Sequence, residues 1–90
     1  SIMFGKNAYK SRKYLLLSIC KNDIYHCGIY SNCGNSETIT SINTGNIFYN
    51  LEDFVNDILE TKSKNEWKDC LYYNETKKRW RSVKYLLKKI

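Results

Sequence analysis

GNIFYNLEDFVNDIL, residues 45–59, is the stretch that decides the fold. It begins with aromatic and β-branched side chains at residues 46–49, which are typical of a short strand. Asn50 stands where a helix N-cap is expected, and Glu52 and Asp53 make the first turn acidic, as the positive end of a helix dipole prefers. Apolar side chains then recur at spacings of three and four: Leu51, Phe54, Val55, Ile58 and Leu59. A helix that is apolar along one face packs on a sheet, so the stretch predicts a strand followed by a helix that covers a sheet.

Two further strands are expected before this one. Ile24 to Ser31 is rich in β-formers and contains Gly28, which marks a bulge or a close backbone approach. Glu37 to Ile42 alternates between apolar and polar residues, after a turn at residues 32–36. Asn43-Thr44-Gly45 is a tight turn in which the glycine can take a positive φ. Together with residues 46–49, these segments predict an antiparallel meander of three strands.

The region before residue 24 fits two structures. Five of its residues lie on one helical face (Ala8, Leu15, Leu16, Ile19 and Cys20), while Leu15, Leu17 and Ile19 also alternate as they would in a strand that ends at an Asn22-Asp23 hairpin turn. We favour the helix for residues 8–20. Residues 1–7 are expected to be a flexible lead-in. Because the chain begins with Ser1, we also expect it to be a piece of a longer protein.

The C-terminal part predicts a fourth strand and a second helix. Lys62 to Glu66 is a polar loop, Trp67 to Tyr73 is the strand, and Asn74 to Lys78 closes it. The helix follows from an apolar stripe at helical spacing: Trp80, Val83, Leu86, Leu87 and Ile90. We therefore predict one small α+β domain over residues 1–90. It has a small antiparallel sheet, made of the three-strand meander plus a fourth strand, packed by a central and a C-terminal helix.

Composition limits the class of protein. Ninety residues support one core, and with a hydrophobic fraction of 42% disorder is not expected. The apolar run Tyr14 to Cys20 is far shorter than the roughly 20 residues of a membrane span, and no signal-peptide cleavage site follows it. We expect an intracellular protein, nuclear or cytoplasmic, without a membrane partner and with its four cysteines reduced. Its 12 lysines, 3 arginines, ten asparagines, one alanine and no proline suggest an AT-rich genome, such as that of a large DNA virus or a protist parasite.

Charge is segregated along the chain. Residues 1–22 carry five basic and no acidic side chains, residues 23–76 three basic and nine acidic, and residues 77–90 seven basic and no acidic. Two cationic ends favour an anionic polymer as partner, and the excess of lysine over arginine favours contact with the phosphate backbone. The candidate phosphate contacts are Lys77, Lys78, Arg79, Arg81, Lys84 and Lys88, extended by Lys10, Arg12 and Lys13 if the two ends lie together. A solvated lysine-rich helix face is the alternative interpretation of the terminal cluster.

Aromatic residues add candidates for stacking on bases. Trp67 and Trp80 are expected to pack in the core. Tyr30, Tyr72 and Tyr73 are the possible base-stacking residues. Because neighbouring residues of a strand point to opposite faces, one of Tyr72 and Tyr73 should be exposed.

Three segments carry a resemblance to a known family: Ile47 to Phe54, Asn65-Glu66-Trp67, and Trp80 to Leu86. Their order resembles that of the RAMA domain, a small α+β module associated with restriction enzymes and adenine methylases. The resemblance implies chromatin-associated DNA binding, in some cases with sensing of modified bases. The chain departs from the family pattern at Asn50-Leu51, where Ser or Pro is usual, and at Glu66, where Gly is usual. It transfers no base-binding residue.

Catalytic and metal-binding patterns are weak. Cys20, Cys27, Cys33 and Cys70 do not have the spacing of structural zinc sites, and His26 beside Cys27 on a strand would point to the opposite face. We expect no catalytic residue, no metal and no cofactor, and hence a protein that is not an enzyme. The leading hypothesis is a nucleic-acid-binding module that contacts duplex DNA. The alternative is a protein-interaction or assembly module with a protein partner or a homo-oligomer, in which the acidic central helix pairs with the basic ends.

Overall fold

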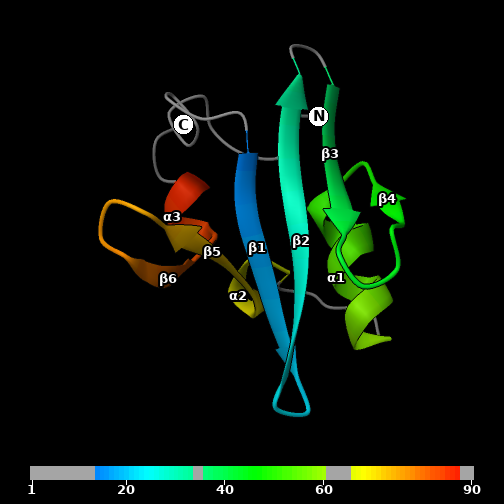
Figure 1. Ribbon diagram of the computed structural model, residues 1–90. Helices are drawn as coiled ribbons and strands as arrows, with labels where there is room; N and C mark the ends of the chain where they lie inside the picture. Colours follow the sequence, from blue (N-terminus) through cyan, green and yellow to red (C-terminus); the bar gives the residue numbers. More distant parts are fainter. Residues whose placement is uncertain (1–13, 34–35, 61–65, 88–90) are drawn as a thin grey trace.

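The computed structural model describes residues 14–33, 36–60 and 66–87. Its centre is an antiparallel sheet of six strands in the spatial order β4-β3-β2-β1-β5-β6 (Figure 1). The strands are β1 (Tyr14–Lys21), β2 (Ile24–Cys33), β3 (Ser36–Ser41), β4 (Ile47–Phe48), β5 (Cys70–Asn74) and β6 (Arg79–Ser82). The helices are α1 (Leu51–Leu59), α2 (Glu66–Asp69) and α3 (Lys84–Leu87). The α+β class is confirmed in its coarse form, with more strand and less helix than the sequence predicts.

The decisive stretch adopts the predicted structure. β2, β3 and β4 form the expected antiparallel meander. Gly45 has a φ of 77° in the turn that precedes β4. Asn50 caps α1, because its side-chain oxygen accepts a hydrogen bond of 2.7 Å from the backbone N–H of Asp53. Local signals at these residues are therefore sufficient to place α1, whereas β4 covers only Ile47–Phe48 of the strand predicted at residues 46–49.

The helix favoured for residues 8–20 is wrong wherever the structure describes it. Tyr14–Lys21 is strand β1, which lies between β2 and β5 and pairs with both. A two-residue turn joins β1 to β2, with Asn22 and Asp23 at φ of 53° and 64°, as the alternative interpretation required. A strand with partners on both sides gains a complete hydrogen-bond ladder, which the helical periodicity of the segment cannot reveal. Residues 1–13, including the lead-in, lie outside the described residues.

The C-terminal helix is also wrong in its extent. Residues 79–82 form β6, which pairs with β5 from Leu71↔Ser82 to Asn74↔Arg79, and α3 is a single turn. Asn74 starts the connecting turn by accepting a 3.0 Å hydrogen bond from the backbone N–H of Lys77, and this reverses the chain before a helix can begin. The predicted fourth strand is confirmed from Cys70 onward, whereas Trp67 belongs to α2. Ile90 lies outside the described residues.

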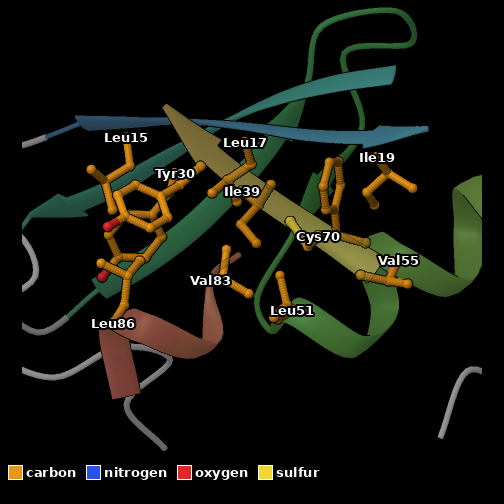
Figure 2. Close-up of a cluster of buried hydrophobic side chains, with 12 residues drawn as sticks. Leu15, Leu17, Ile19, Tyr30, Ile39, Leu51, Val55, Cys70, Val83 and Leu86 are labelled. Atoms are coloured by element: carbon orange, nitrogen blue, oxygen red, sulfur yellow. The ribbon is translucent and has the colours of Figure 1, made fainter. Parts of the chain in front are cut away.

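The core lies on one face of the sheet. Figure 2 shows buried side chains from β1, β2, β3 and β5 gathered between the sheet on one side and α1 and α3 on the other. The buried cluster comprises Leu15, Leu17, Ile19, Tyr30, Ile39, Leu51, Phe54, Val55, Cys70, Tyr72, Val83 and Leu86. The backbone N–H of Val83 donates a 3.1 Å hydrogen bond to the carbonyl of Cys70, which holds the start of α3 against β5.

Gly28 is where α1 approaches the sheet most closely among the glycines that the structure describes. A Cβ at this position would stand 2.6 and 2.7 Å from two carbons of the Phe54 ring and 3.0 Å from Ile39. Phe54 is fully buried and packs edge-on against Phe48, with ring centroids 5.8 Å apart. Gly28 thus marks a close approach, but the approaching group is an aromatic side chain and not the backbone that the sequence suggests.

We predict that Gly28→Ala lowers the free energy of unfolding by about 1–3 kcal/mol, because the new methyl group overpacks against Phe54. In a Phe54→Leu background, the loss in free energy of unfolding caused by Gly28→Ala should be smaller by at least about 1 kcal/mol. A double-mutant cycle with unfolding in urea measures this coupling. Gly45→Ala is the control, since nothing lies within 4 Å of its Cβ position and only its positive φ is strained. An equal cost of Gly28→Ala in both backgrounds would show that Phe54 is not the obstacle.

Candidate nucleic-acid interface

The β5–β6 hairpin gathers the described part of the C-terminal cationic cluster. The hairpin tip, defined as residues 75–78, carries Lys77 and Lys78, and β6 begins with Arg79; all three are exposed. Lys78 has a φ of 51°, a left-handed conformation that glycine adopts more easily than any other residue. Within residues 74–87, Glu75 is the one acidic residue beside five basic ones. The predicted cationic helix is therefore a cationic hairpin at the edge of the sheet.

Arg81 and Lys84 belong to the same region but lie around Tyr85. The guanidinium carbon of Arg81 is 4.3 Å from the centre of the Tyr85 ring, and the ammonium nitrogen of Lys84 is 5.5 Å from it. Both distances are within the range of cation–π attraction. Tyr85 is 37% exposed, so these two cations lie against a partly exposed aromatic ring of α3. Sequence reasoning missed Tyr85, because the expected long helix gave it no partner.

Trp80 is exposed rather than buried. As β6 is a strand, Trp80 stands directly opposite Tyr73 of β5, and the two rings pack edge to face with centroids 5.3 Å apart. The Trp80 side chain keeps 41% of its surface exposed, so the expectation that it packs in the core is wrong. The side chain of Trp67 lies outside the described residues. An indole held by a neighbouring ring and open to solvent is a suitable surface for stacking.

Two of the three predicted stacking residues are unavailable. Tyr30 is fully buried and its hydroxyl donates a hydrogen bond to Glu37, while Tyr72 is 8% exposed within the core cluster. Both lie on the core face of the sheet, because their strand positions are paired with Leu15 and Leu17. Tyr73 points the opposite way, is half-buried and remains a candidate. One of Tyr72 and Tyr73 is expected to be exposed; Tyr73 is the more open of the two but is half-buried, so the expectation is met in part.

The outer face of the sheet, opposite the core, is free of charge over the residues that the structure describes. The strand registers assign to it Tyr14, Leu16, Ser18 and Cys20 of β1; Tyr25, Cys27, Ile29 and Ser31 of β2; Ser36, Thr38 and Thr40 of β3; Ile47 of β4; Leu71 and Tyr73 of β5; and Trp80 and Ser82 of β6. Neither α1 nor α3 lies on this side of the sheet (Figure 2). In the sequence, this face corresponds to one set of alternate positions in each strand, and the described residues at those positions include no Lys, Arg, Asp or Glu.

One row of the outer face runs across the whole sheet. The strand pairings place Trp80 beside Tyr73, Leu16 beside Ile29, and Ile29 beside Thr40. Thr40 is paired in turn with Ile47, and continuing the Leu17↔Tyr72 register by one residue brings Leu16 level with Tyr73. Six strands at a spacing of about 4.8 Å give the row a length of roughly 24 Å.

The remaining charged candidates lie elsewhere. Lys10, Arg12, Lys13 and Lys88 are outside the described residues, so whether the two ends lie together stays untested. The acidic residues of α1, which are Glu52, Asp53 and Asp57, are exposed, as is Glu60 at its C-cap. Glu60 pairs with Lys21 of β1 at 3.2 Å. The acidic surface thus belongs to α1, and the cationic one to the hairpin and α3.

Cys20, Cys27 and Cys70 are free thiols in three different environments. Cys20 is exposed, Cys27 is half-buried and Cys70 is buried. Burial raises the pKa of the Cys70 thiol to about 12, so this thiol is neutral and a poor nucleophile near neutral pH. Within the described residues, no three His, Cys, Asp or Glu side chains are grouped so that they could hold a metal ion.

We predict that iodoacetamide at pH 8 modifies Cys20 in the native protein and leaves Cys70 unmodified until urea unfolds the chain, as peptide mass spectrometry would show. The raised pKa also gives a pH dependence. Because the unfolded chain loses the Cys70 proton at lower pH than the folded one, this group lowers stability progressively as pH rises from about 9 to about 12. Equal rates of iodoacetamide modification at Cys20 and Cys70 in the native protein would contradict the burial of Cys70.

Comparison with known proteins adds no relative, since no protein-family model, curated protein or solved structure matches the chain. The resemblance to the RAMA domain therefore stays a prediction. In the described part of the chain, no helix is both long and apolar enough to cross a membrane.

Proposed function

We propose that this chain is a nucleic-acid-binding module that contacts the phosphate backbone through the β5–β6 hairpin. The observation that carries the proposal is the group of exposed cations on the hairpin tip and the start of β6: Lys77, Lys78 and Arg79. Multiple lysines and arginines on one element can replace the counterions condensed on phosphates, and the release of those counterions drives binding.

The backbone conformation of Lys78 supports a role for its charge. A non-glycine residue in the left-handed region costs about 1–2 kcal/mol relative to a relaxed conformation. Glycine is the usual residue at such a position in a hairpin turn. Strained residues of this kind cluster at binding sites, where the side chain is retained despite its conformational cost. A lysine at this point of the tip extends the cationic surface beyond the end of the sheet.

The shape of the hairpin is compatible with both duplex and single-stranded nucleic acid. A two-stranded ribbon fits the major groove of B-DNA, as the duplex hypothesis requires. The same cations can follow the backbone of a single strand. Phosphate contact is common to the two forms, so the first experiment tests it with both. By the RAMA resemblance, DNA is the preferred polymer.

We predict that the double variant Lys77→Gln/Lys78→Gln weakens binding to a fluorescein-labelled 12-nucleotide DNA, single-stranded or duplex, in anisotropy titrations at low salt. Two lost phosphate contacts should reduce the slope of log K against log salt by about 1.4 to 1.8. The matched control is Lys21→Gln/Lys68→Gln, which has the same net charge. Its two positions lie near the opposite end of the β1–β5 ladder, beyond the Ile19↔Cys70 pair.

Two results would contradict the proposal. One is the absence of binding to either DNA at low salt. The other is an equal loss of affinity in the two double variants, which would mean that net charge alone attracts the polymer. A urea titration of each variant confirms that the fold is retained, which is expected because the hairpin tip is exposed.

A further inference from the structure

We infer that the outer face of the sheet binds the unpaired bases of a single strand, with Trp80 and Tyr73 as the first stacking position. The inference rests on the proposed function, because it takes the phosphate contact at the hairpin tip as given. It specifies that the bound nucleic acid is a single strand, and it names the surface that distinguishes a single strand from a duplex.

The first step of the argument is the charge of the surface. None of the described outer-face residues is charged, and the large exposed side chains among them are Tyr14, Tyr25, Ile47 and Trp80. Phosphates gain nothing from such a face, whereas bases are flat and largely apolar and can cover it. A duplex hides the faces of its bases in the stack, so only unpaired bases can lie on a sheet in this way.

The second step is the position of the cations. Lys77 and Lys78 occupy the loop that joins β5 to β6, and Tyr73 and Trp80 are the outer-face residues of these strands closest to that loop. The cationic tip therefore adjoins the aromatic end of an uncharged surface. A single nucleic-acid strand has the matching distribution, with anionic phosphates along one side and apolar bases along the other.

The third step is the geometry of the stacking position. The 70° angle between the Tyr73 and Trp80 rings leaves them edge to face, and this contact restrains the indole while 41% of Trp80 stays exposed. A base can stack on the open indole without first displacing Tyr73. Beyond this pair, the row continues toward the middle of the sheet through Leu16 and Ile29, which are half-buried, whereas Ser18 on the same face is 2% exposed.

The fourth step concerns a second copy of this chain as an alternative occupant. β6 is an edge strand, and pairing with another β6 would bring the Arg79 and Arg81 side chains of two chains together. Like charges on an edge strand oppose such pairing. Face-to-face packing of two copies would also bring the two cationic tips into one assembly of high positive charge. Charge complementarity therefore favours the nucleic-acid strand.

The test compares a labelled 12-nucleotide oligothymidine with a 12-base-pair duplex, using the full chain. We expect the single strand to bind more tightly than the duplex at the same salt concentration. Trp80→Leu should weaken single-strand binding about 5- to 150-fold, the range expected from the loss of one base–aromatic stack. Trp80→Phe should stay within about threefold of the parent chain, because it keeps an aromatic face. Tyr49→Leu removes a more exposed aromatic residue, 68% against 41% for Trp80, that follows β4 at the opposite edge of the sheet from β6, and it should leave binding unchanged.

The outcomes separate this inference from the proposed function. If duplex binds as tightly as single strand and Trp80→Leu has no effect, the inference fails while backbone binding by the hairpin stands. If Lys77→Gln/Lys78→Gln has no effect on either DNA, both fail. Sedimentation velocity tests whether a second copy of the chain occupies the outer face. If the parent chain forms a dimer that Trp80→Leu dissociates, the face belongs to a second copy and the inference is overturned. A urea midpoint for each variant ensures that a loss of binding is not a loss of fold.

Discussion

The contact between the Phe54 ring and the bare backbone of Gly28 sets how the rest of the molecule is arranged. It lets α1 lie close to the sheet, and the Phe48 ring and the Ile39 side chain complete the packing around it. The helix can approach only one face, and the core forms on that face. Val83 and Leu86 extend the same core beside β5 and β1 (Figure 2). The orientation of every strand residue, inward or outward, follows from this choice through the period of two in a strand.

One-sided packing determines what the other face of the sheet can do. A sheet covered on one side usually presents polar and charged residues on the side that faces water. Here the described outer face has hydroxyl, thiol, aliphatic and aromatic side chains, and the cations are displaced to the hairpin at the edge of the sheet. The separation of a neutral face from a cationic edge is the property that a polymer with charged and uncharged sides can recognise. Neither the acidic surface of α1 nor the core takes part in it.

The sequence predicts those parts of the fold that depend on local chemistry. Asn50 has a capping side chain and Gly45 can adopt a positive φ, so each signal is complete within a few residues. The helix prediction is wrong at residues 14–20 because the leucines and the isoleucine of this segment fit both the helical period and the strand period. Only the pairing of β1 with both β2 and β5, which are separated by some forty residues, decides between them.

The candidate site was predictable in its charges and not in its shape. The charge run alone makes Lys77, Lys78 and Arg79 candidate phosphate contacts. The same run fitted a helical stripe through Trp80 and Val83, and that stripe placed Trp80 in the core. The Asn74 turn and the pairing of β6 with β5 bring Trp80 to the opposite face instead. The absence of charge on the outer face becomes visible only when the registers of all six strands are known, since it is a property of alternate residues on different strands.

The central claim is that a neutral sheet face and a cationic edge act together as one binding surface. Its most direct test is a titration of the ¹⁵N-labelled chain with oligothymidine, followed by amide and tryptophan indole shifts. The account predicts that the largest shifts occur at the Trp80 indole and the amides of Tyr73 and residues 76–82, with smaller ones at Leu16 and Ile29 and none on the exposed side of α1. Shifts confined to α1, or spread evenly over all lysine-bearing segments, would contradict it.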